Sequence, residues 1–303
     1  MWQLYSLCAI VSNTLEETID KATMLRSSTL DTVAAAWLRN IVVFGIAILA
    51  ATLLQHSFPP IIASFAIALW GFLYAVQAIS YTFILKHVEL TAASVTIGLL
   101  PLVFLPIDLF VTHAPISVMQ IAGIIVLVAG GIVFFLRRDM REKLLTRSFL
   151  FMLLSLLTFD ALIFGSESYI FKGYFAREGL MPASFLVSGM LYMCIFLTIF
   201  LAVHALRMRG NISLLGAWRY TRGSMLAKCA DYGNIFFSLQ ALTIASVSQV
   251  AAMKVIHPVA LLLVTMITQH TLKVNLDEMF TRDTIVQKTL GILLIVIGSF
   301  MIR

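Results

Sequence analysis

Two stretches of this 303-residue chain match each other closely: Gly123-Ile-Ile-Val-Leu-Val-Ala-Gly130 and Gly291-Ile-Leu-Leu-Ile-Val-Ile-Gly298. In each stretch an apolar segment carries two glycines seven positions apart. Seven residues make about two helical turns, so both glycines lie on one face and let a second helix approach closely. The two stretches therefore predict a pair of equivalent, tightly packed helices.

The similarity extends outward into a helical hairpin that occurs twice, over residues 90–135 and 244–301. Both copies begin with small and polar residues and reach a proline within an apolar run, Pro101 in the first and Pro258 in the second. Because proline removes an i→i−4 hydrogen bond, we expect both helices to bend at equivalent places. The repeat indicates that a half-chain was duplicated.

The composition is that of an α-helical integral membrane protein. Hydrophobic residues make up 60% of the chain and charged residues only 12%, whereas soluble domains carry roughly a quarter charged residues. Apolar runs of about 20 residues recur, each enough to span the ~30 Å hydrocarbon core. They predict ten transmembrane helices, at residues 1–22, 33–54, 60–84, 88–112, 117–136, 147–171, 182–205, 223–242, 245–269 and 285–302.

The sequence gives little support to other classes of protein. The net charge of +6 does not indicate nucleic-acid binding, because the basic residues cluster in short loops. The cysteines Cys8, Cys194 and Cys229 are scattered, which favours neither disulfides nor a zinc site. No metalloprotease, hydrolase or Walker motif is present, so we predict no catalytic residue, metal ligand or cofactor.

The first predicted helices of the two halves also match. Glu16-Glu-Thr-Ile-Asp-Lys21 aligns with Glu167-Ser-Tyr-Ile-Phe-Lys172, 151 positions later. We therefore divide the chain into two five-helix repeats, residues 1–145 and 146–303. Because five is odd, the two repeats must cross the membrane in opposite senses, as an inverted repeat. This architecture predicts alternating access, with a site between the halves near the middle of the membrane.

Together these features resemble the drug/metabolite transporter superfamily, in its EamA-type branch. The resemblance rests on five plus five helices, on prolines in the fourth and ninth, and on glycine pairs in the fifth and tenth. Ala34-Ala-Ala-Trp-Leu-Arg39, at the start of the second helix, is similar to the arginine-bearing motif of that family. The resemblance covers nearly the whole chain and implies a ten-helix secondary transporter with both termini in the cytoplasm.

The basic residues predict the opposite orientation. When the loops are numbered alternately, sixteen Lys and Arg residues fall on one side, among them those of 137–147 and 207–228, and three on the other. The positive-inside rule places the richer side in the cytoplasm and both termini outside it. We expect a multi-pass protein of the plasma or inner membrane, in contact with lipid and a small-molecule substrate but not with nucleic acid.

Ionisable residues inside the predicted helices are costly in lipid, so we treat them as candidates for a site in the bundle interior. The first helix carries Asn13, Glu16, Glu17 and Asp20 on one face. Glu17 could equally form an i,i+4 ion pair with Lys21, and we expect Asp20 near the membrane interface. The predicted substrate-binding residues are Asn13, Glu16, Glu17, Trp70, Tyr74, Asp160, Glu167, Asp231, Lys254 and His257.

Several of these residues have two possible roles. Asp160 and Asp231 show no same-helix cation within reach, so each either serves function or forms a cross-helix hydrogen bond. Trp70 and Tyr74 either pack between helices or cover an ammonium group with their ring faces. Lys254 either neutralises an aspartate or holds a substrate carboxylate. Arg39, which we assign a structural role, is typical of an arginine that reaches the membrane interface or pairs with an acid. His257 is more typical of a buried core histidine than of a proton relay.

The acidic residues among these candidates outnumber Arg39 and Lys254 by five to two. We therefore expect a secondary active transporter of a small polar metabolite, a cationic amine or an amino acid, with a buried carboxyl that exchanges a proton for the solute. The alternative is a transporter or exchanger of an anionic or nucleotide-like metabolite, in which Arg39 and Lys254 would dominate the site. A different class altogether would be a membrane scaffold or an intramembrane enzyme with an unfamiliar motif.

Overall fold

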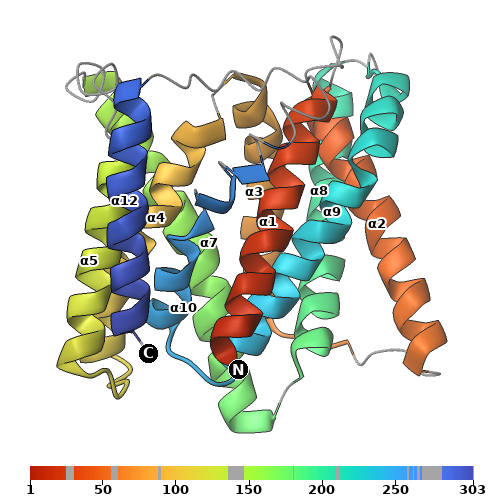
Figure 1. Cartoon of the computed structure of the whole chain (residues 1–303). Helices are drawn as coiled ribbons and strands as arrows, with labels where there is room; N and C mark the ends of the chain where they lie inside the picture. The colour runs from red at the N-terminus through yellow and green to blue at the C-terminus, as the bar shows by residue number, and fades with distance from the viewer. Residues whose placement is uncertain are drawn as a thin grey trace.

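The computed structural model describes residues 1–24, 31–55, 61–87, 90–135, 147–179, 181–208, 212–257, 259–261, 263–264, 267 and 282–302. Over these residues the chain is all-helical, and Figure 1 shows one bundle of roughly upright helices with both termini at the same end. The ten helices described are α1 (Trp2–Met24), α2 (Thr32–Gln55), α3 (Phe65–His87), α4 (Leu90–Phe110), α5 (Val118–Phe135), α7 (Arg147–Glu178), α8 (Pro182–Arg207), α9 (Leu214–Leu242), α10 (Val247–Lys254) and α12 (Arg282–Met301).

Each predicted helix has a counterpart, but α7 and α9 are longer than predicted. The prediction ended the sixth helix at residue 171, and α7 continues to Glu178. The prediction began the eighth helix at residue 223, and α9 begins at Leu214. Ser213 caps this earlier start, since its hydroxyl oxygen accepts a hydrogen bond from the Gly216 amide at 3.4 Å.

The predicted ninth helix is interrupted. It was expected to run from residue 245 to residue 269, but α10 ends at Lys254 and a turn follows at Val255 and Ile256. The Val255 amide bonds to the carbonyl three residues earlier, Ala252, at 3.1 Å, which tightens the chain as at many helix ends. Pro258 lies outside the described residues, whereas Pro101 lies within α4, which continues past it.

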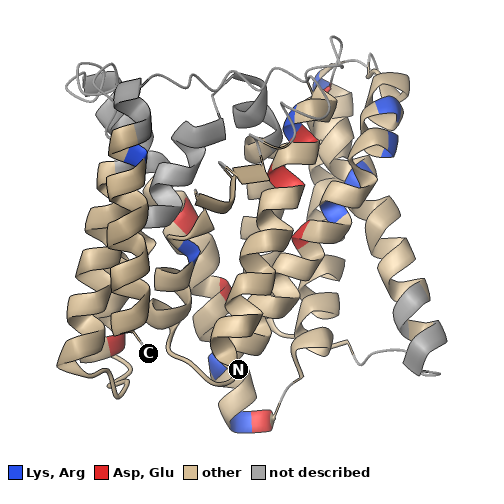
Figure 2. Cartoon of the chain, in the orientation of Figure 1, with Lys and Arg blue, Asp and Glu red and all other residues tan. Residues whose placement is uncertain are grey.

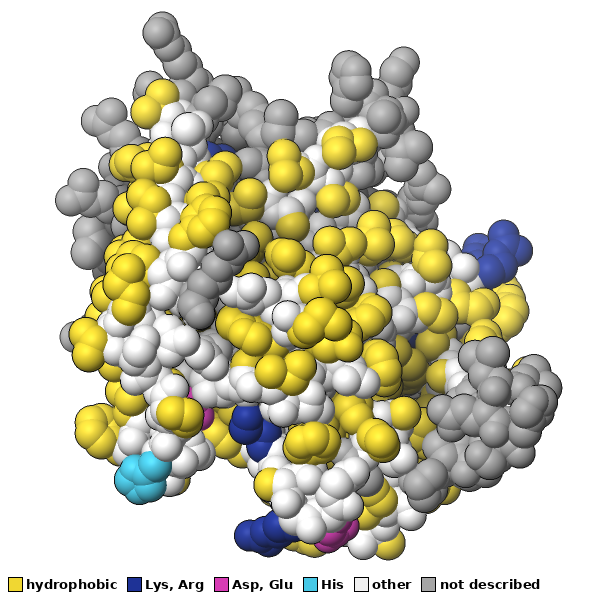
Figure 3. Space-filling view, turned by 60° about the horizontal axis from the view of Figure 1, so that its bottom comes forward, with side chains coloured by type: hydrophobic (Ala, Val, Ile, Leu, Met, Phe, Trp, Pro, Cys, Tyr) yellow, Lys and Arg dark blue, Asp and Glu magenta, His cyan; other side chains and the backbone are white. Residues whose placement is uncertain are grey.

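Two of the described helical segments, Thr32–Leu49 in α2 and Pro182–Arg207, are long and apolar enough to cross a membrane. Shorter apolar helical stretches lie in α3, α4, α5 and α12. Charged residues occur at mid-height in the central helices as well as at the two ends of the bundle (Figure 2). The space-filling view shows hydrophobic side chains spread over one face, with only a few charged ones (Figure 3).

The two glycine-bearing helices, α5 and α12, pack against each other. A Cβ atom added at Gly130 would lie 2.8 Å from the Ile295 amide nitrogen and 2.9 Å from the Gly291 carbonyl oxygen. One added at Gly298 would lie 2.7 Å from the Leu127 amide nitrogen. Because these neighbours are backbone atoms, they cannot move aside as a flexible side chain could. The close approach expected from the glycine spacing is confirmed, and each helix is the partner of the other.

This contact gives the first testable prediction. We expect Gly130→Leu to lower the stability of the purified protein by about 1–3 kcal/mol or more, because the added side chain forces two backbones apart. Gly45→Leu is the matched control, since no atom lies within 4 Å of a Cβ built on that α2 glycine. Thermal unfolding in detergent would measure both variants. An equal loss for the two would contradict this account of the α5–α12 contact.

Candidate functional site

Polar side chains from both halves of the chain meet around a central cavity with a volume of about 160 Å³. Its polar lining comes from α1, α2, α3, α7, α9 and α10, and from the turn that follows α10. Ile10, Leu100, Ile163, Phe164 and Ile235 supply most of the apolar lining. The polar residues that line it are Asn13, Glu16, Glu17, Arg39, Tyr74, Gln77, Tyr81, Asp160, Glu167, Lys228, Asp231, Asn234, Lys254 and His257.

The cavity brings together every predicted substrate-binding residue except Trp70. The Trp70 ring is fully buried and stacks on Phe185, with ring centroids 4.9 Å apart. It also occupies the space that a side chain at Gly189 would need. Trp70 therefore packs between α3 and α8. Of the two roles that the sequence left open, packing between helices and covering an ammonium group, Trp70 has the first. Tyr74, one turn further along α3, does line the cavity.

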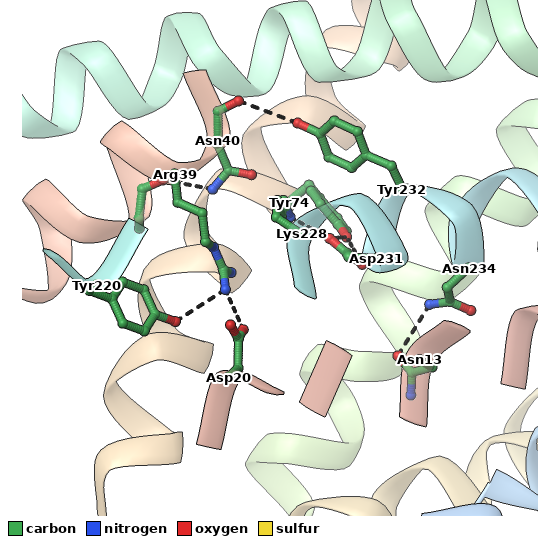
Figure 4. A network of polar contacts seen from close by, with 11 residues as sticks. Asn13, Asp20, Arg39, Asn40, Tyr74, Tyr220, Lys228, Asp231, Tyr232 and Asn234 are labelled. Atoms are coloured by element: carbon green, nitrogen blue, oxygen red, sulfur yellow. Dashed lines mark hydrogen bonds and ion pairs between the residues drawn. The ribbon is translucent and has the colours of Figure 1, made fainter. Parts of the chain in front are cut away.

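Lys228 and Asp231 form a buried ion pair within α9. The Tyr74 hydroxyl lies 2.8 Å from each oxygen of the Asp231 carboxylate, to which it donates. The Lys228 ammonium also lies over the rings of Tyr74 and Tyr232, 5.1 and 5.2 Å from their centroids. Figure 4 shows this cluster from close by. The face of Tyr74 is thus already covered by a cation of the protein itself.

This pair corrects two statements made from the sequence. Asp231 was expected to have no cation in reach on its own helix, and Lys228 was counted as a loop residue. Lys228 is one turn before Asp231 in α9 and is 2% exposed. The Lys-x-x-Asp spacing within the predicted helix 223–242 was the signal that could have found the pair.

Arg39 forms an ion pair with Asp20. Of the two roles expected for Arg39, interfacial or ion-paired, this is the second. Its Nη1 forms the ion pair and also donates to the Tyr220 hydroxyl at 3.1 Å (Figure 4). Asp20 was expected near the membrane interface; it lies in the last turns of α1, and its side chain is fully buried between helices. Asp20 Oδ1 and Arg39 Nε have no hydrogen-bond partner within the described part of the chain. The pair is therefore incompletely satisfied, and the cost of desolvating two charges is only partly recovered.

A chain of amide contacts joins α1, α9 and the turn after α10. The Asn234 amide donates to Asn13 Oδ1 at 3.2 Å, and the Asn13 amide lies 3.2 Å from Glu17 Oε1 and 3.0 Å from His257 Nε2. Because an amide NH₂ only donates, His257 Nε2 accepts and the ring proton sits on Nδ1. That Nδ1 has no partner among the described residues. Glu17 Oε2 lies 3.6 Å from His257 Nε2, so Glu17 faces His257 across the cavity wall.

Three charged groups in the cavity, Glu16, Glu167 and Lys254, form no hydrogen bond or ion pair with any residue that the structure describes. The two carboxylates are 6% and 4% exposed. The Lys254 ammonium lies 4.1 Å from the centroid of the Phe164 ring. Asp160 also lines the cavity but already interacts with a neighbouring residue.

Glu16 and Glu167 are the residues that the sequence alignment pairs at a separation of 151 positions. They lie on α1 and α7, the first helix of each proposed repeat, and both reach the same cavity. The cations of the cavity number three rather than two, because Lys228 joins Arg39 and Lys254. Of these three, only Lys254 has no carboxylate partner among the described residues.

No protein-family model and no curated protein matches this sequence. Solved structures do match it. In one crystal structure of a protein, the match covers 99% of this chain and 97% of that chain, with a TM-score of 0.66 and 14% sequence identity. At this identity the similarity shows the fold alone, and it extends over essentially the whole length of both chains.

Proposed function

We propose that this chain is a membrane-embedded secondary transporter for a small solute that carries an ammonium group. The observation that carries the proposal is a central cavity lined by two buried carboxylates, Glu16 and Glu167, which come from equivalent helices and have no hydrogen-bond or ion-pair partner among the described residues. A buried carboxylate is costly unless a cation neutralises it, and an ammonium group supplies that charge. Lys254, which lines the same cavity, can hold a carboxylate, so amino acids as well as amines fit the cavity.

The distribution of polarity supports a place in the membrane. Large apolar side chains are exposed on the sides of the bundle, for example Leu49, Val203, Leu226, Leu293 and Phe300. Most of the charged side chains that line the cavity are buried instead. A soluble protein places its charges outside and seldom exposes so much apolar surface. We propose a multi-pass protein of the plasma or inner membrane.

The helix contacts support an inverted repeat. Exchanging the halves replaces α1 by α7, α2 by α8, α3 by α9, α4 by α10 and α5 by α12. Under this exchange the contact of α1 with α9 becomes that of α7 with α3, and the contact of α2 with α9 becomes that of α8 with α3; all four occur. In Figure 1, α1 leads away from the end that holds the termini and α7 leads back towards it. Such repeats commonly alternate access to a central site.

The interruption after α10 also supports a transport site. Transporters often bind their solute where a membrane helix is broken, since backbone groups freed there can face a polar cavity. Here the helix ends at Lys254, and His257 follows directly after the turn. Both residues line the cavity. The break thus places two polar side chains from one short segment beside Glu167 and Glu17.

The anion alternative has less support, because Arg39 is bound by Asp20 and Lys228 by Asp231. A scaffold would have no use for two buried acids at equivalent positions that lack a partner among the described residues. A thermal-shift screen of purified protein against amines, amino acids and nucleotides tests the proposal, since a ligand of the folded state raises the melting temperature. Solute flux into proteoliposomes then tests transport. Stabilisation by nucleotides alone would favour the anion alternative, and no flux for any stabilising ligand would refute the transporter.

The orientation is a separate prediction. Lys21, Lys228 and Lys288 were counted as loop residues but are 8%, 2% and 8% exposed within helices. Without them the basic residues still favour the side that holds 137–147. We therefore expect a cysteine placed between residues 137 and 146 to resist an impermeant thiol reagent in intact cells, and Glu178→Cys to react. The reverse pattern would establish the orientation that the family resemblance implies.

A further inference from the structure

An ion-pair cluster lies beside the cavity at the end of the bundle opposite the termini. Asp20, Arg39 and Tyr220, here called the latch, join α1, α2 and α9. Each lies within about two turns of a helix end, and Figure 1 shows those three ends at the top of the bundle. Arg39 itself lines the cavity, and all three side chains are buried. The latch thus lies between the cavity and this end of the molecule.

An aromatic cluster lies at the end that holds the termini. Trp70, Phe171 and Phe185, here called the plug, join α3, α7 and α8. The Phe185 ring lies 4.9 Å from that of Trp70 and 5.4 Å from that of Phe171, measured between centroids. All three residues are 0% exposed. The plug contacts the site through Tyr74, whose ring centroid lies 5.8 Å from that of Trp70.

The latch and the plug occupy equivalent places in the two halves. Exchanging the halves turns the helices of the latch, α1, α2 and α9, into those of the plug, α7, α8 and α3. The alignment of the two repeats places Phe171 at the position of Asp20, 151 residues later. One aligned position therefore carries an ion-paired acid in one half and an aromatic ring in the other.

We infer that the latch and the plug are the two gates of the cavity, one ionic and one aromatic. This inference rests on the proposed transport function. Opening at the latch separates a salt bridge. Water can then satisfy Asp20 Oδ1 and Arg39 Nε, two buried atoms that have no hydrogen-bond partner among the described residues. Opening at the plug exposes three large rings to water, and this exposure is unfavourable. The protein therefore opens more readily at the latch end than at the plug end.

Accessibility of a cysteine in the cavity tests the two gates without any solute. Ile163, a buried residue of the cavity wall, would be changed to Cys in a background with Cys8, Cys194 and Cys229 replaced by Ser. The protein would be reconstituted in vesicles and labelled with a small impermeant cationic methanethiosulfonate from one side at a time. Protease cleavage of a C-terminal tag reports the orientation, because the C-terminus lies at the plug end (Figure 1).

We expect Asp20→Asn to raise the labelling rate from the latch end by about tenfold or more, the ratio that ~1.4 kcal/mol produces. Phe171→Ala should raise the rate from the plug end by a similar factor, and neither variant should change the rate from the other end. The exchange of both charges, Asp20→Arg with Arg39→Asp, should restore the slow rate. If Asp20→Asn does not fold, Tyr220→Phe, which removes one hydroxyl from the latch, is expected to give a smaller increase on the same side.

Matched controls come from the same helices. Asp31→Asn breaks a partly exposed contact with His204, 3.1 Å long, at the latch end of α2. Phe72→Ala removes a ring that contacts Phe196 between α3 and α8 but is itself 36% exposed. Neither should change labelling from either side.

Three results would overturn the gates: equal acceleration from both sides, acceleration from the wrong side, or a control that matches its gate variant. Side-specific labelling without solute flux would refute the transporter and leave the gates standing. Solute flux without side-specific labelling would refute the gates and leave the transporter standing.

Discussion

Glu16→Gln and Glu167→Gln are each expected to weaken binding of the ammonium-bearing solute by about 30-fold or more, and together to abolish its uptake. Removing one partner of a buried charge pair typically costs at least ~2 kcal/mol, which corresponds to this factor. Glutamine keeps the size of the side chain and removes its charge. Binding is measured by calorimetry on purified protein, and uptake in proteoliposomes with and without a pH gradient. If these carboxyls exchange a proton for the solute, the variants also lose stimulation by the gradient.

Glu178→Gln is the matched control, because Glu178 is an exposed acid at the end of the same helix as Glu167. It should leave binding and uptake unchanged. Wild-type affinity in both cavity variants would refute the acidic site. Loss of binding with Lys254→Met alone, while both acids are dispensable, would establish the anion alternative. The structure directs this experiment to Glu16 and Glu167 and away from Asp231, whose charge is already paired with Lys228.

Lys228→Met is expected to destabilise the protein by about 3–5 kcal/mol, because it leaves the Asp231 carboxylate buried without its cation. The double variant Lys228→Met with Asp231→Leu should recover most of that loss, since apolar replacements of a buried ion pair are often neutral. Unfolding in detergent, followed for both single variants and the double variant, gives the coupling energy between the two residues.

Arg222→Met is the control for this cycle, since Arg222 is an exposed basic residue of α9. Its stability should remain within about 0.5 kcal/mol of the wild type. A loss for Lys228→Met no larger than for Arg222→Met would mean that the buried pair is not needed for stability. A loss for the double variant as large as for the single variant would point to the packing of the long lysine side chain instead.

Most of the helices and most of the cavity residues could be predicted from the sequence. Length and apolarity are properties of one segment, so the ten helices were predicted, although the end of α7, the start of α9 and the end of α10 were misplaced. The glycine spacing predicted a close helix pair because glycine has no side chain, so a second helix can approach its backbone closely. We expected ionisable residues within the helices to face the bundle interior. Glu16, Glu167 and Lys254 do so, and they line the same cavity.

The partner of each charged residue was decided only by the tertiary structure. Arg39 pairs with Asp20, 19 positions away, and also binds Tyr220, 181 positions away. Tyr74 binds Asp231 across 157 positions, and Trp70 enters the α3–α8 contact instead of the cavity. Helical periodicity states which face a residue occupies but not which other helix lies against that face. Which carboxylates have a partner among the described residues therefore depends on packing between distant segments, and no single segment of the sequence contains that information.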